Sequence, residues 1–404
     1  MSTTQRKGEQ PSQATSAPNI VYVTDEAVYS GAAPAPSLHV SAVCRAFCKL
    51  GAGVVLIAST ARDGSTSEDV TAPLRRPLRL ATFRLQWRIL RRLLALGRED
   101  TAHAVLYARA SQLLVAPVVF AAIRRRPLVV EYNGRLIDET LEVGSCLSRL
   151  LARTGVLGVI ERQVVSRSTA VVAVSARVKD YLLKRSPQAA AKIYVVPNGV
   201  DTSIFAPARD KAEVRRQLGI DPSTALIIFV GELLPWQQLQ VLLEAMADVL
   251  VHRPETELVL LGQGIVEREL KATAHDLGIS GRARFMGRLL QKDVARWLAA
   301  SDVAVYLPAA QRGASPLKLY EYLACGVPVV ATRTAEIAAE FGEQLEYCES
   351  ANRQDVSRAL LRVLGPSTQP SSSPIASSPI VRSWETVAGE LLPIVRAAAD
   401  GAQP

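Results

Sequence analysis

Residues 315–332 read SPLKLYEYLACGVPVVAT, and this stretch predicts a helix that leads directly into a buried strand. An apolar-faced helix is expected from about Leu317 to Ala324, with Gly326 as its C-cap and Pro328 shortly after it. The strand is expected from Val327 to Ala331. A loop–helix–strand unit of this kind is typical of an α/β domain.

The start of that helix has the features of a phosphate site. The loop before it, residues 311–315, is rich in small and polar residues. A helix N-terminus offers unpaired N–H groups and a partial positive charge, so it binds phosphates. Glu321 lies one turn inside, where a carboxylate accepts hydrogen bonds from a ribose diol. Together these features indicate a nucleotide site, although an ordinary structural unit explains the same residues equally well.

Short β-branched runs alternate with helical patterns along most of the chain, which predicts parallel sheets with helices on both faces. Turn residues at 197–199 interrupt the pattern, which then restarts. The expected strands are Ile20–Val23, Val54–Ala58, Ala104–Tyr107, Leu128–Tyr132, Ala170–Ala173 and Ile193–Val196, then Leu226–Val230, Glu257–Leu261, Arg284–Met286, Val303–Leu307 and Val327–Ala331. Two doubly wound units in tandem place a ligand-binding cleft at the carboxyl ends of their strands.

The length and composition agree with two domains. The chain has 404 residues, 49% of them hydrophobic, which is too long for one typical core and apolar enough for two. We expect a disordered tail (1–17), an N-terminal Rossmann-like domain (18–200), a C-terminal Rossmann-like domain (201–380) and a last helix (381–404) that returns to the N-terminal domain. Residues 366–379 form a Ser/Pro linker within this arrangement.

Several features indicate a cytoplasmic protein. The first 18 residues have no apolar segment of the signal-peptide type, and no run of about 18 apolar residues follows. Five scattered cysteines are interpreted as reduced thiols. The formal net charge is +9, yet no nucleic-acid-binding signature accompanies it, so nucleic acid is not expected as a partner.

Arginines cluster between residues 75 and 98, at Arg75, Arg76, Arg79, Arg84, Arg88, Arg91, Arg92 and Arg98. Within this stretch, residues 83–94 have a helical pattern with Phe83, Trp87, Leu90 and Leu94 on one face. One interpretation is a domain helix with that face in the core and its arginines in water. The other is peripheral contact with an anionic membrane surface, on the inner face of the membrane. The sequence favours the core interpretation without excluding the other.

Further segments resemble a known enzyme family. In order and spacing, IYVVPNGVDTSIFAP (193–207), LIIFVG (226–231), TELVLLGQG (256–264) and RFMGRLLQKDVARWLAASDV (284–303) resemble the retaining, nucleotide-sugar-dependent glycosyltransferases of GT-B family four. NIVYVTDEAVYSG (19–31) and SLHVSAVCRAFCKLGAGVVLIAS (37–59) resemble their N-terminal half, so the likeness runs from about residue 18 to 400. It implies a GT-B fold, with an acceptor domain and a nucleotide-sugar domain facing a cleft.

The resemblance also implies an activity and its site. The expected reaction moves a sugar from a nucleotide-sugar donor to an acceptor hydroxyl with retention, and the donor is a substrate, so no cofactor is expected. Glu321 would contact the donor ribose. The family's other glutamate falls at Gly313 and is missing, which leaves Gln311 as the nearest polar candidate for a catalytic role. The remaining donor-binding positions are Gly31, Gly231, Gln237, Gln238, Gly262, Gly287, Arg288, Ser315 and Leu317.

A second departure concerns the diphosphate. The family carries basic residues just after the LIIFVG strand, but here GELLPWQQLQ (231–240) has none. Losing one charge-stabilising donor costs on the order of 3 kcal/mol in the transition state. Lys318 is the best catalytic candidate to replace that charge, and Arg312 and Arg288 are the next. Gln237 and Gln238 would act as neutral hydrogen-bond donors.

On the acceptor side, Glu131 and Asn133 lie at the end of a strand of the N-terminal half and are the candidates for acceptor binding, with a solvated loop as the equally good alternative. His39 is expected to be structural. Neither an Asp-x-Asp motif near the cleft segments nor a His/Cys cluster is present, which predicts a metal-independent reaction. Two other functions stay open: a catalytically weak or silent GT-B partner subunit, and a GT-B nucleotide-sugar epimerase.

Overall fold

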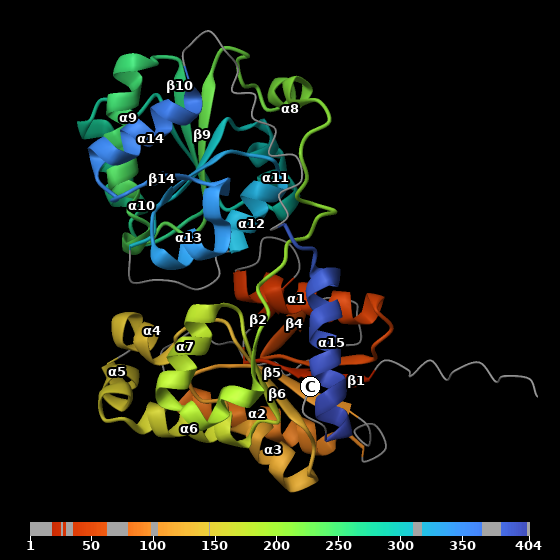
Figure 1. Cartoon of the computed structure of the whole chain (residues 1–404). Helices are drawn as coiled ribbons and strands as arrows, with labels where there is room; N and C mark the ends of the chain where they lie inside the picture. The colour runs from red at the N-terminus through yellow and green to blue at the C-terminus, as the bar shows by residue number, and fades with distance from the viewer. Residues whose placement is uncertain are drawn as a thin grey trace, which may run out of the picture.

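The computed structural model describes residues 18–25, 27–29, 35–62, 80–97, 104–144, 146–309, 317–365 and 381–401. Two α/β domains lie one above the other, the N-terminal domain below the C-terminal domain in Figure 1. The tail (1–17), the whole Ser/Pro linker (366–379) and the loop 310–316 lie outside the described residues.

The N-terminal domain contains a six-stranded parallel sheet in the order β3-β1-β5-β6-β7-β8. Its strands are β1 (Asn19–Val23), β3 (Val54–Ile57), β5 (Ala104–Arg109), β6 (Leu128–Tyr132), β7 (Ala170–Ala173) and β8 (Ile193–Val195). Its helices are α1 (Ala35–Lys49), α2 (Leu80–Ala95), α3 (Ala116–Arg124), α4 (Leu136–Val143), α5 (Cys146–Arg153), α6 (Val156–Arg167) and α7 (Ala176–Arg185). A separate parallel pair, β2 (Ala27–Tyr29) and β4 (Thr60–Arg62), was not predicted.

The C-terminal domain repeats the plan with a parallel sheet in the order β11-β10-β9-β12-β13-β14. Its strands are β9 (Ala225–Val230), β10 (Thr256–Leu261), β11 (Ala283–Gly287), β12 (Val303–Tyr306), β13 (Val329–Thr332) and β14 (Glu346–Cys348). Its helices are α8 (Lys211–Gln217), α9 (Leu239–His252), α10 (Glu267–Asp276), α11 (Gln291–Ala300), α12 (Leu317–Ala324), α13 (Ala335–Phe341) and α14 (Arg353–Leu364). The sequence prediction missed β14, a short strand at the sheet edge.

Each sheet is covered on both faces by apolar cores. This explains the near-continuous hydrophobic strands, such as the LVVEY of β6, of which all five residues are buried. In each sheet the strand order reverses beside the first strand, between β1 and β5 and between β9 and β12. Doubly wound sheets bind ligands outside the carboxyl ends of the strands at such a point.

The last helix, α15 (Trp384–Asp400), belongs to the N-terminal domain in space. Its N-cap Ser383 accepts a hydrogen bond from the Thr386 amide at 3.1 Å. Its buried face packs against α1, and Val387, Leu391 and Val395 join one of the two N-terminal cores. Figure 1 shows this helix running alongside the lower domain.

The chain therefore crosses between the domains twice, and the two crossings lie side by side. The Val200 amide donates to the Arg382 carbonyl at 2.8 Å, and Val200 forms a parallel bridge with Ser383. A Cβ added to Gly199 would lie 3.0 Å from the Ser383 carbonyl oxygen, so the absence of a side chain permits this close approach.

Helix α2 buries a different set of side chains from the face that its sequence pattern predicted. The core side is formed by Leu85, Ile89 and Leu93. Trp87 is 60% exposed and Leu94 37% exposed, whereas Leu90 packs against the core, so the face expected in the core is only partly buried. Leucines occur on both sides of this helix, and periodicity alone could not decide which side is buried. Phe83 lies where side chains are not described.

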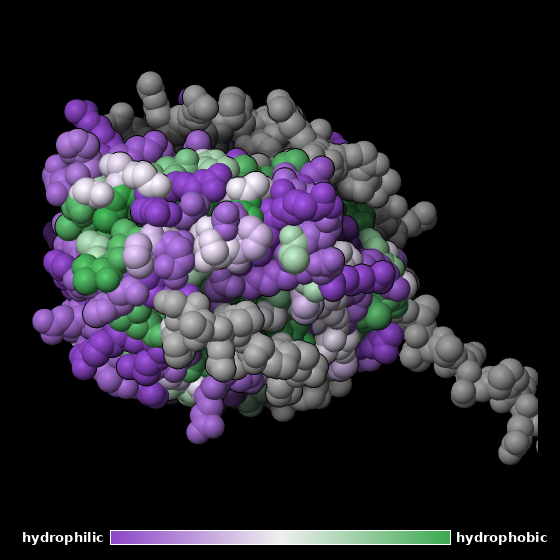
Figure 2. Space-filling model, turned by 90° about the horizontal axis from the view of Figure 1, so that it is seen from above, coloured by the Kyte–Doolittle hydropathy of each residue, from purple (hydrophilic) through white to green (hydrophobic). Residues whose placement is uncertain are grey.

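The described helices include none that is both long and apolar enough to cross a membrane. Figure 2 shows the molecule from above, at the outer end of the C-terminal domain, where hydrophilic side chains predominate and hydrophobic ones occur in scattered groups. The exposed apolar residues of α2 belong to the other domain.

Candidate functional site

A cavity of about 500 Å³ lies between the two domains. The C-terminal domain lines it with the end of β9, the turns after β10 and β11, and the first turns of α11 and α12. The N-terminal domain contributes residues of α1 and the ends of β5 and β6, and Trp384 of α15 closes one side. The cavity therefore occupies the position that the two strand-order reversals predict.

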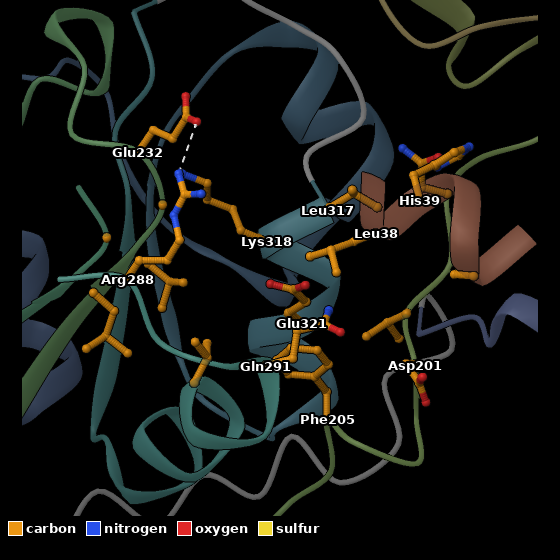
Figure 3. Close-up of a pocket in the computed structure, with 18 of the residues that line it drawn as sticks. Leu38, His39, Asp201, Phe205, Glu232, Arg288, Gln291, Leu317, Lys318 and Glu321 are labelled. Atoms are coloured by element: carbon orange, nitrogen blue, oxygen red, sulfur yellow. Dashed lines mark ion pairs between the residues drawn. The ribbon is translucent and has the colours of Figure 1, made fainter. Parts of the chain in front are cut away.

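Helix α12 supplies the central charged residues of the cavity, Lys318 and Glu321. The helix holds its position through Tyr322, whose hydroxyl accepts from the Val230 amide at 3.0 Å and donates to the Val230 carbonyl at 3.2 Å. Gly326 ends the helix with a left-handed φ of 70°. Figure 3 shows Glu321 near the middle of the group of lining residues, whereas Lys318 extends from α12 toward Arg288 and Glu232.

The Lys318 ammonium lies at the end of β9, enclosed by aromatic rings and Gln237. It is 4.6 Å from the Phe229 ring centre and 5.6 Å from that of Tyr306. It also donates to Gln237 Oε1 at 3.3 Å. A Cβ added to Gly231 would lie 2.6 Å from Lys318 Nζ, and Gly231 has a φ of 144°, so glycine is needed for this arrangement.

The turn after β10 approaches the same point. Gly262 has a φ of 140°, and a Cβ there would lie 1.8 Å from the Gly231 carbonyl oxygen. Its amide donates to the Gly287 carbonyl at 2.7 Å, which joins the ends of β10 and β11, and the Gly231 amide donates to the Leu261 carbonyl at 2.9 Å, which joins β9 to β10. The resulting wall is mostly backbone, which lets a ligand approach closely.

Arg288, just after Gly287, also lines the cavity. Its guanidinium lies 3.9 Å from a carboxylate oxygen of Glu232, and both side chains are substantially exposed (Figure 3). This positive charge is therefore partly compensated, and Lys318 is the better-enclosed cation of the two.

Burial changes the proton affinities of the α12 pair. It raises the pKa of Glu321 to about 7, and the Lys318 charge limits that rise. It lowers the pKa of Lys318 to about 8, against the opposing effect of Glu321 and Glu232. Both groups therefore titrate near neutral pH, where a bound anion or diol would decide their charge states.

The opposite wall, from the N-terminal domain, carries a hydrogen-bonded group built around buried Glu131. Its Oε1 lies 2.5 Å from His39 Nε2 and accepts from Asn133 Nδ2 at 2.6 Å, while Oε2 accepts from the Tyr107 hydroxyl at 2.6 Å. Burial alone would raise the pKa of Glu131, but His39, Arg109 and Tyr107 outweigh it and hold that pKa at about 2. His39 and Asn133 line the cavity.

The structure brings most of the sequence-predicted residues that it describes to this cavity. The lining residues among them are Gly231, Gln237, Gly262, Arg288, Leu317, Lys318, Glu321 and Asn133. Gly287 lies directly behind the wall. Glu131 is only 2% exposed and lies beneath His39 and Asn133, so it supports the wall without forming its surface. Gln238 begins α9 with a φ of 51° and is not part of the lining described.

Four further candidates, Gly31, Gln311, Arg312 and Ser315, fall outside the described residues, as does Gly313. The proposed phosphate-binding start of α12 is thus described only from Leu317 onward. Leu317 itself packs against the apolar core shared by α1 and α15 across the domain boundary.

His39, expected to be structural, lines the cavity, and sequence reasoning missed further lining residues, which are Arg45, Arg109, Asp201, Phe205, Trp236, Gln291 and Trp384. They come from distant segments and share no local motif. Across the described ranges, no group of three or more His, Cys, Asp or Glu side chains is placed to hold a metal ion.

Two family models match this chain. Residues 210–367 match "Glycosyl transferases group 1", and residues 37–204 match "Glycosyltransferase Family 4". The first covers the C-terminal domain with α12 and its cavity residues, and the second covers the N-terminal domain with His39 and Glu131.

Curated relatives match part of the chain. A GDP-mannose-dependent monoacylated alpha-(1-6)-phosphatidylinositol monomannoside mannosyltransferase of Corynebacterium glutamicum is 35% identical over 144 residues, 34% of this chain and 37% of that protein. A D-inositol 3-phosphate glycosyltransferase of Segniliparus rotundus is 32% identical over 189 residues, 46% of this chain and 41% of that protein. The chain thus spans less than half the length of these relatives.

Solved structures match the whole architecture. Sucrose-phosphate synthase of Thermosynechococcus elongatus superposes with a TM-score of 0.68 over 95% of this chain and 97% of that one, at 16% identity. At this identity the likeness shows the fold alone, which is the two-domain GT-B fold that the sequence predicted.

Proposed function

Since this chain belongs to the group 1 glycosyltransferases, we propose that it moves a sugar from a nucleotide-sugar donor to an acceptor hydroxyl. The proposal includes retention of the anomeric configuration and a reaction without metal. The observation that carries it is the placement of Lys318 and Glu321 on one helix, facing one interdomain cavity at the carboxyl end of β9.

The two charges suit two parts of a nucleotide diphosphate. The Glu321 carboxylate accepts hydrogen bonds from the ribose diol, and the Lys318 ammonium faces the diphosphate beside Gly231. The backbone wall of Gly231 and Gly262 lets the phosphates approach N–H groups without steric conflict. The nucleotide base would then lie beside the exposed side chain of Arg288.

In the proposed reaction, the bond between the anomeric carbon and the phosphate oxygen breaks, and its electron pair stays on the phosphate. The acceptor oxygen bonds to the same face of the anomeric carbon, and its proton passes to the departing phosphate. Negative charge develops on that phosphate, so a cation already fixed in a water-poor cavity stabilises the transition state. Lys318 supplies that charge.

The metal-free part of the proposal rests on this same cation. Lys318 is enclosed by Phe229, Tyr306 and Gln237, so its charge is less screened than that of a surface lysine. It takes the place of the basic residues that are absent from residues 231–240. A side-chain cation in this position makes a bridging metal ion unnecessary.

A silent partner subunit is the second candidate, and one observation favours it. The segment after β9 offers Glu232 and Gln237 toward the cavity, where a donor diphosphate would gain from positive charge. A protein that retained donor binding but had lost turnover would show this pattern.

The acceptor is proposed to be presented at an anionic membrane surface. On α2 and the adjoining α3, the exposed residues Arg84, Trp87, Arg91, Leu94 and Ile123 combine cations with apolar side chains. Tryptophan and arginine together suit the boundary between lipid headgroups and acyl chains. One relative is named for a phosphatidylinositol mannoside, which is a lipid, and this agrees with such a location.

Thermal shift with a panel of UDP-, GDP-, TDP- and ADP-sugars tests the donor part of the proposal. A donor that binds the folded state raises the melting temperature by mass action. The donor that does so should also be hydrolysed slowly in the absence of acceptor, with release of the nucleoside diphosphate. A shift without any hydrolysis supports the silent subunit, and no shift with any donor contradicts both functions.

A further inference from the structure

Arg109 ends β5 at the N-terminal wall of the cavity, and its guanidinium has no partner in the fold. The residue is half-buried and lines the cavity. Its Nη1 is enclosed by protein without a hydrogen bond, whereas Nε and Nη2, which also lack partners among the described residues, are not enclosed. A charged group that is partly removed from water is costly unless it is paired, so this guanidinium favours an anion beside its accessible nitrogens.

The two acids that act on Arg109 through space, Glu131 and Asp25, do not supply that anion. Burial favours the neutral form of both acids and Arg109 opposes it, yet neither forms an ion pair with Arg109 in the part of the chain that is described. At Asp25 burial outweighs the opposing groups and the pKa is raised. Glu131 already has three side-chain partners. Arg109 therefore keeps donors for a group from outside the fold.

The position of Arg109 assigns this anion to the acceptor side of the cavity. Arg109 pairs in register with Glu131 of the neighbouring strand β6, so it belongs to the wall that contains His39 and Asn133. The Lys318 ammonium, which is proposed to face the donor diphosphate, lies beside Gly231 in the other domain. The cavity thus has a cation on each wall, one for each substrate.

A second arginine lies at the rim on the same side. Arg45 of α1 lines the cavity, and its guanidinium is 3.8 Å from a carboxylate oxygen of Asp201 with 61% of its side chain exposed. An ion pair this long and exposed is weak and yields to a better partner. A phosphate carries up to about two negative charges and three acceptor oxygens, so it uses two arginines better than a carboxylate does.

We infer that the acceptor carries a phosphate group, which Arg109 binds through Nε and Nη2 while Arg45 covers it at the rim. This inference rests on the proposed function, since it names the chemical class of the acceptor. The phosphate is a recognition group and takes no part in bond formation. A hydroxyl elsewhere on the same molecule attacks the donor sugar.

Binding of sn-glycerol 3-phosphate tests the inference without an identified acceptor. The nucleoside diphosphate found in the thermal-shift panel first fills the donor side, so that the probe does not bind at Lys318. Isothermal titration should then show binding of glycerol 3-phosphate and none of glycerol at the same concentrations. Arg109→Met should raise the probe Kd by roughly tenfold or more. Arg109→Lys should recover part of the affinity, because it keeps the charge and loses the planar fork.

Arg396→Met, a change at an exposed arginine of α15, is the matched control and should bind the probe like wild type. An unchanged probe Kd in folded Arg109→Met overturns the inference, and so does equal binding of glycerol and glycerol 3-phosphate. A raised Kd for the nucleoside diphosphate in Arg109→Met would place this cation on the donor side and overturn it too. If wild type binds no donor, the proposed function fails, and the same titration in a Lys318→Met background still tests the phosphate site.

Vesicles distinguish a lipid headgroup from a soluble phosphate. Sedimentation compares phosphatidylcholine vesicles that contain phosphatidic acid with vesicles that contain diacylglycerol. Lower recovery of Arg109→Met than of wild type on phosphatidic acid alone assigns the phosphate to a lipid-linked acceptor. Equal recovery of the two proteins, together with the loss of glycerol 3-phosphate binding, assigns it to a soluble acceptor. Both results support the phosphate site at Arg109.

Discussion

The Lys318 ammonium donates a 3.3 Å hydrogen bond to the side-chain oxygen of Gln237. Gln237 belongs to the segment in which the related family carries basic residues, so a cation from α12 reaches the place where this segment has none. Lys318 thereby places a cation beside a segment that has no basic side chain of its own.

Lys318→Ala is expected to depress kcat by about a hundredfold, because one charge-stabilising group contributes on the order of 3 kcal/mol in such sites. Lys318→Arg should recover part of the loss. Steady-state and single-turnover kinetics with the donor from the thermal-shift panel measure both. Arg288→Ala should have the smaller effect on kcat, since that side chain is exposed and faces Glu232. A fully active Lys318→Ala variant would refute the role.

Removing the positive charge of Lys318 should not weaken the fold. Burial lowers the pKa of Lys318 to about 8, which means that the protein disfavours the charged form relative to the unfolded chain. Removing the charge with Lys318→Met is therefore expected to leave the melting temperature unchanged or to raise it at pH 7. A marked drop in melting temperature would mean that the ammonium is structural. Calorimetry of the ligand-free protein decides between these outcomes.

Glu321→Ala should raise the donor Kd by roughly tenfold or more, since a hydrogen bond to a charged group contributes about 1.5–3 kcal/mol. Isothermal titration with the nucleoside diphosphate measures the effect. The control is Glu269→Ala, which removes an exposed carboxylate from α10 of the same domain. Equal affinity in wild type and folded Glu321→Ala would remove the ribose assignment.

Donor affinity should depend on pH with an optimum between about pH 7 and pH 8. Glu321, with a pKa of about 7, loses its proton as pH rises, and the carboxylate accepts from the diol, so affinity increases. Lys318, with a pKa of about 8, then loses its charge, so affinity decreases. Because Glu321 and Lys318 interact, the two pKa values describe the titration of the pair and not of either residue by itself. Glu321→Gln should abolish the acid limb and Lys318→Met the alkaline limb in titrations from pH 5.5 to 9.5, roughly 1.5 units beyond each value.

Transfer and donor hydrolysis should persist in excess EDTA, because the proposed cation is a side chain. The assay compares chelated protein with the same protein after Mg²⁺ or Mn²⁺ is added back. Activity that disappears on chelation and returns with Mn²⁺ would show that the diphosphate depends on a metal ion.

The α2 surface should bind anionic vesicles at low salt and release them at high salt. Sedimentation with phosphatidylglycerol-containing and neutral vesicles measures this. Trp87→Ser and the double change of Arg84 and Arg91 to Glu should each lower recovery. Val251→Ser, at a 77% exposed residue of α9 in the other domain, is the control and should bind like wild type. Equal recovery with both vesicle types would refute membrane contact.

The sequence predicted the two sheets well because their strands are continuous apolar runs separated by clear turns. It missed β2, β4 and β14, which are three residues each and too short for periodicity to mark. Lys318 and Glu321 were found because a local motif carries them.

His39 was expected to be structural and Trp384 was not singled out, because their place in the cavity wall comes from contact between segments. They are 345 residues apart in the sequence and 5.0 Å apart in space. Glu131 was assigned to the acceptor surface because it lies at the end of a strand, but its side chain is buried below that surface. A side chain at a strand end points up or down according to the pleat, which the sequence did not resolve.

The paired crossings at Val200 and Arg382–Ser383 determine how the cavity can open. A single linker would let one domain rotate freely relative to the other. Two adjacent chain segments joined by a hydrogen bond allow bending between the domains but resist twisting. Opening of the cavity is thereby reduced mainly to one hinge rotation, which moves α1 and α12 on the two cavity walls apart. Each closure then returns Lys318, Glu321 and His39 to the same mutual positions, so the accuracy of the site is set at the hinge.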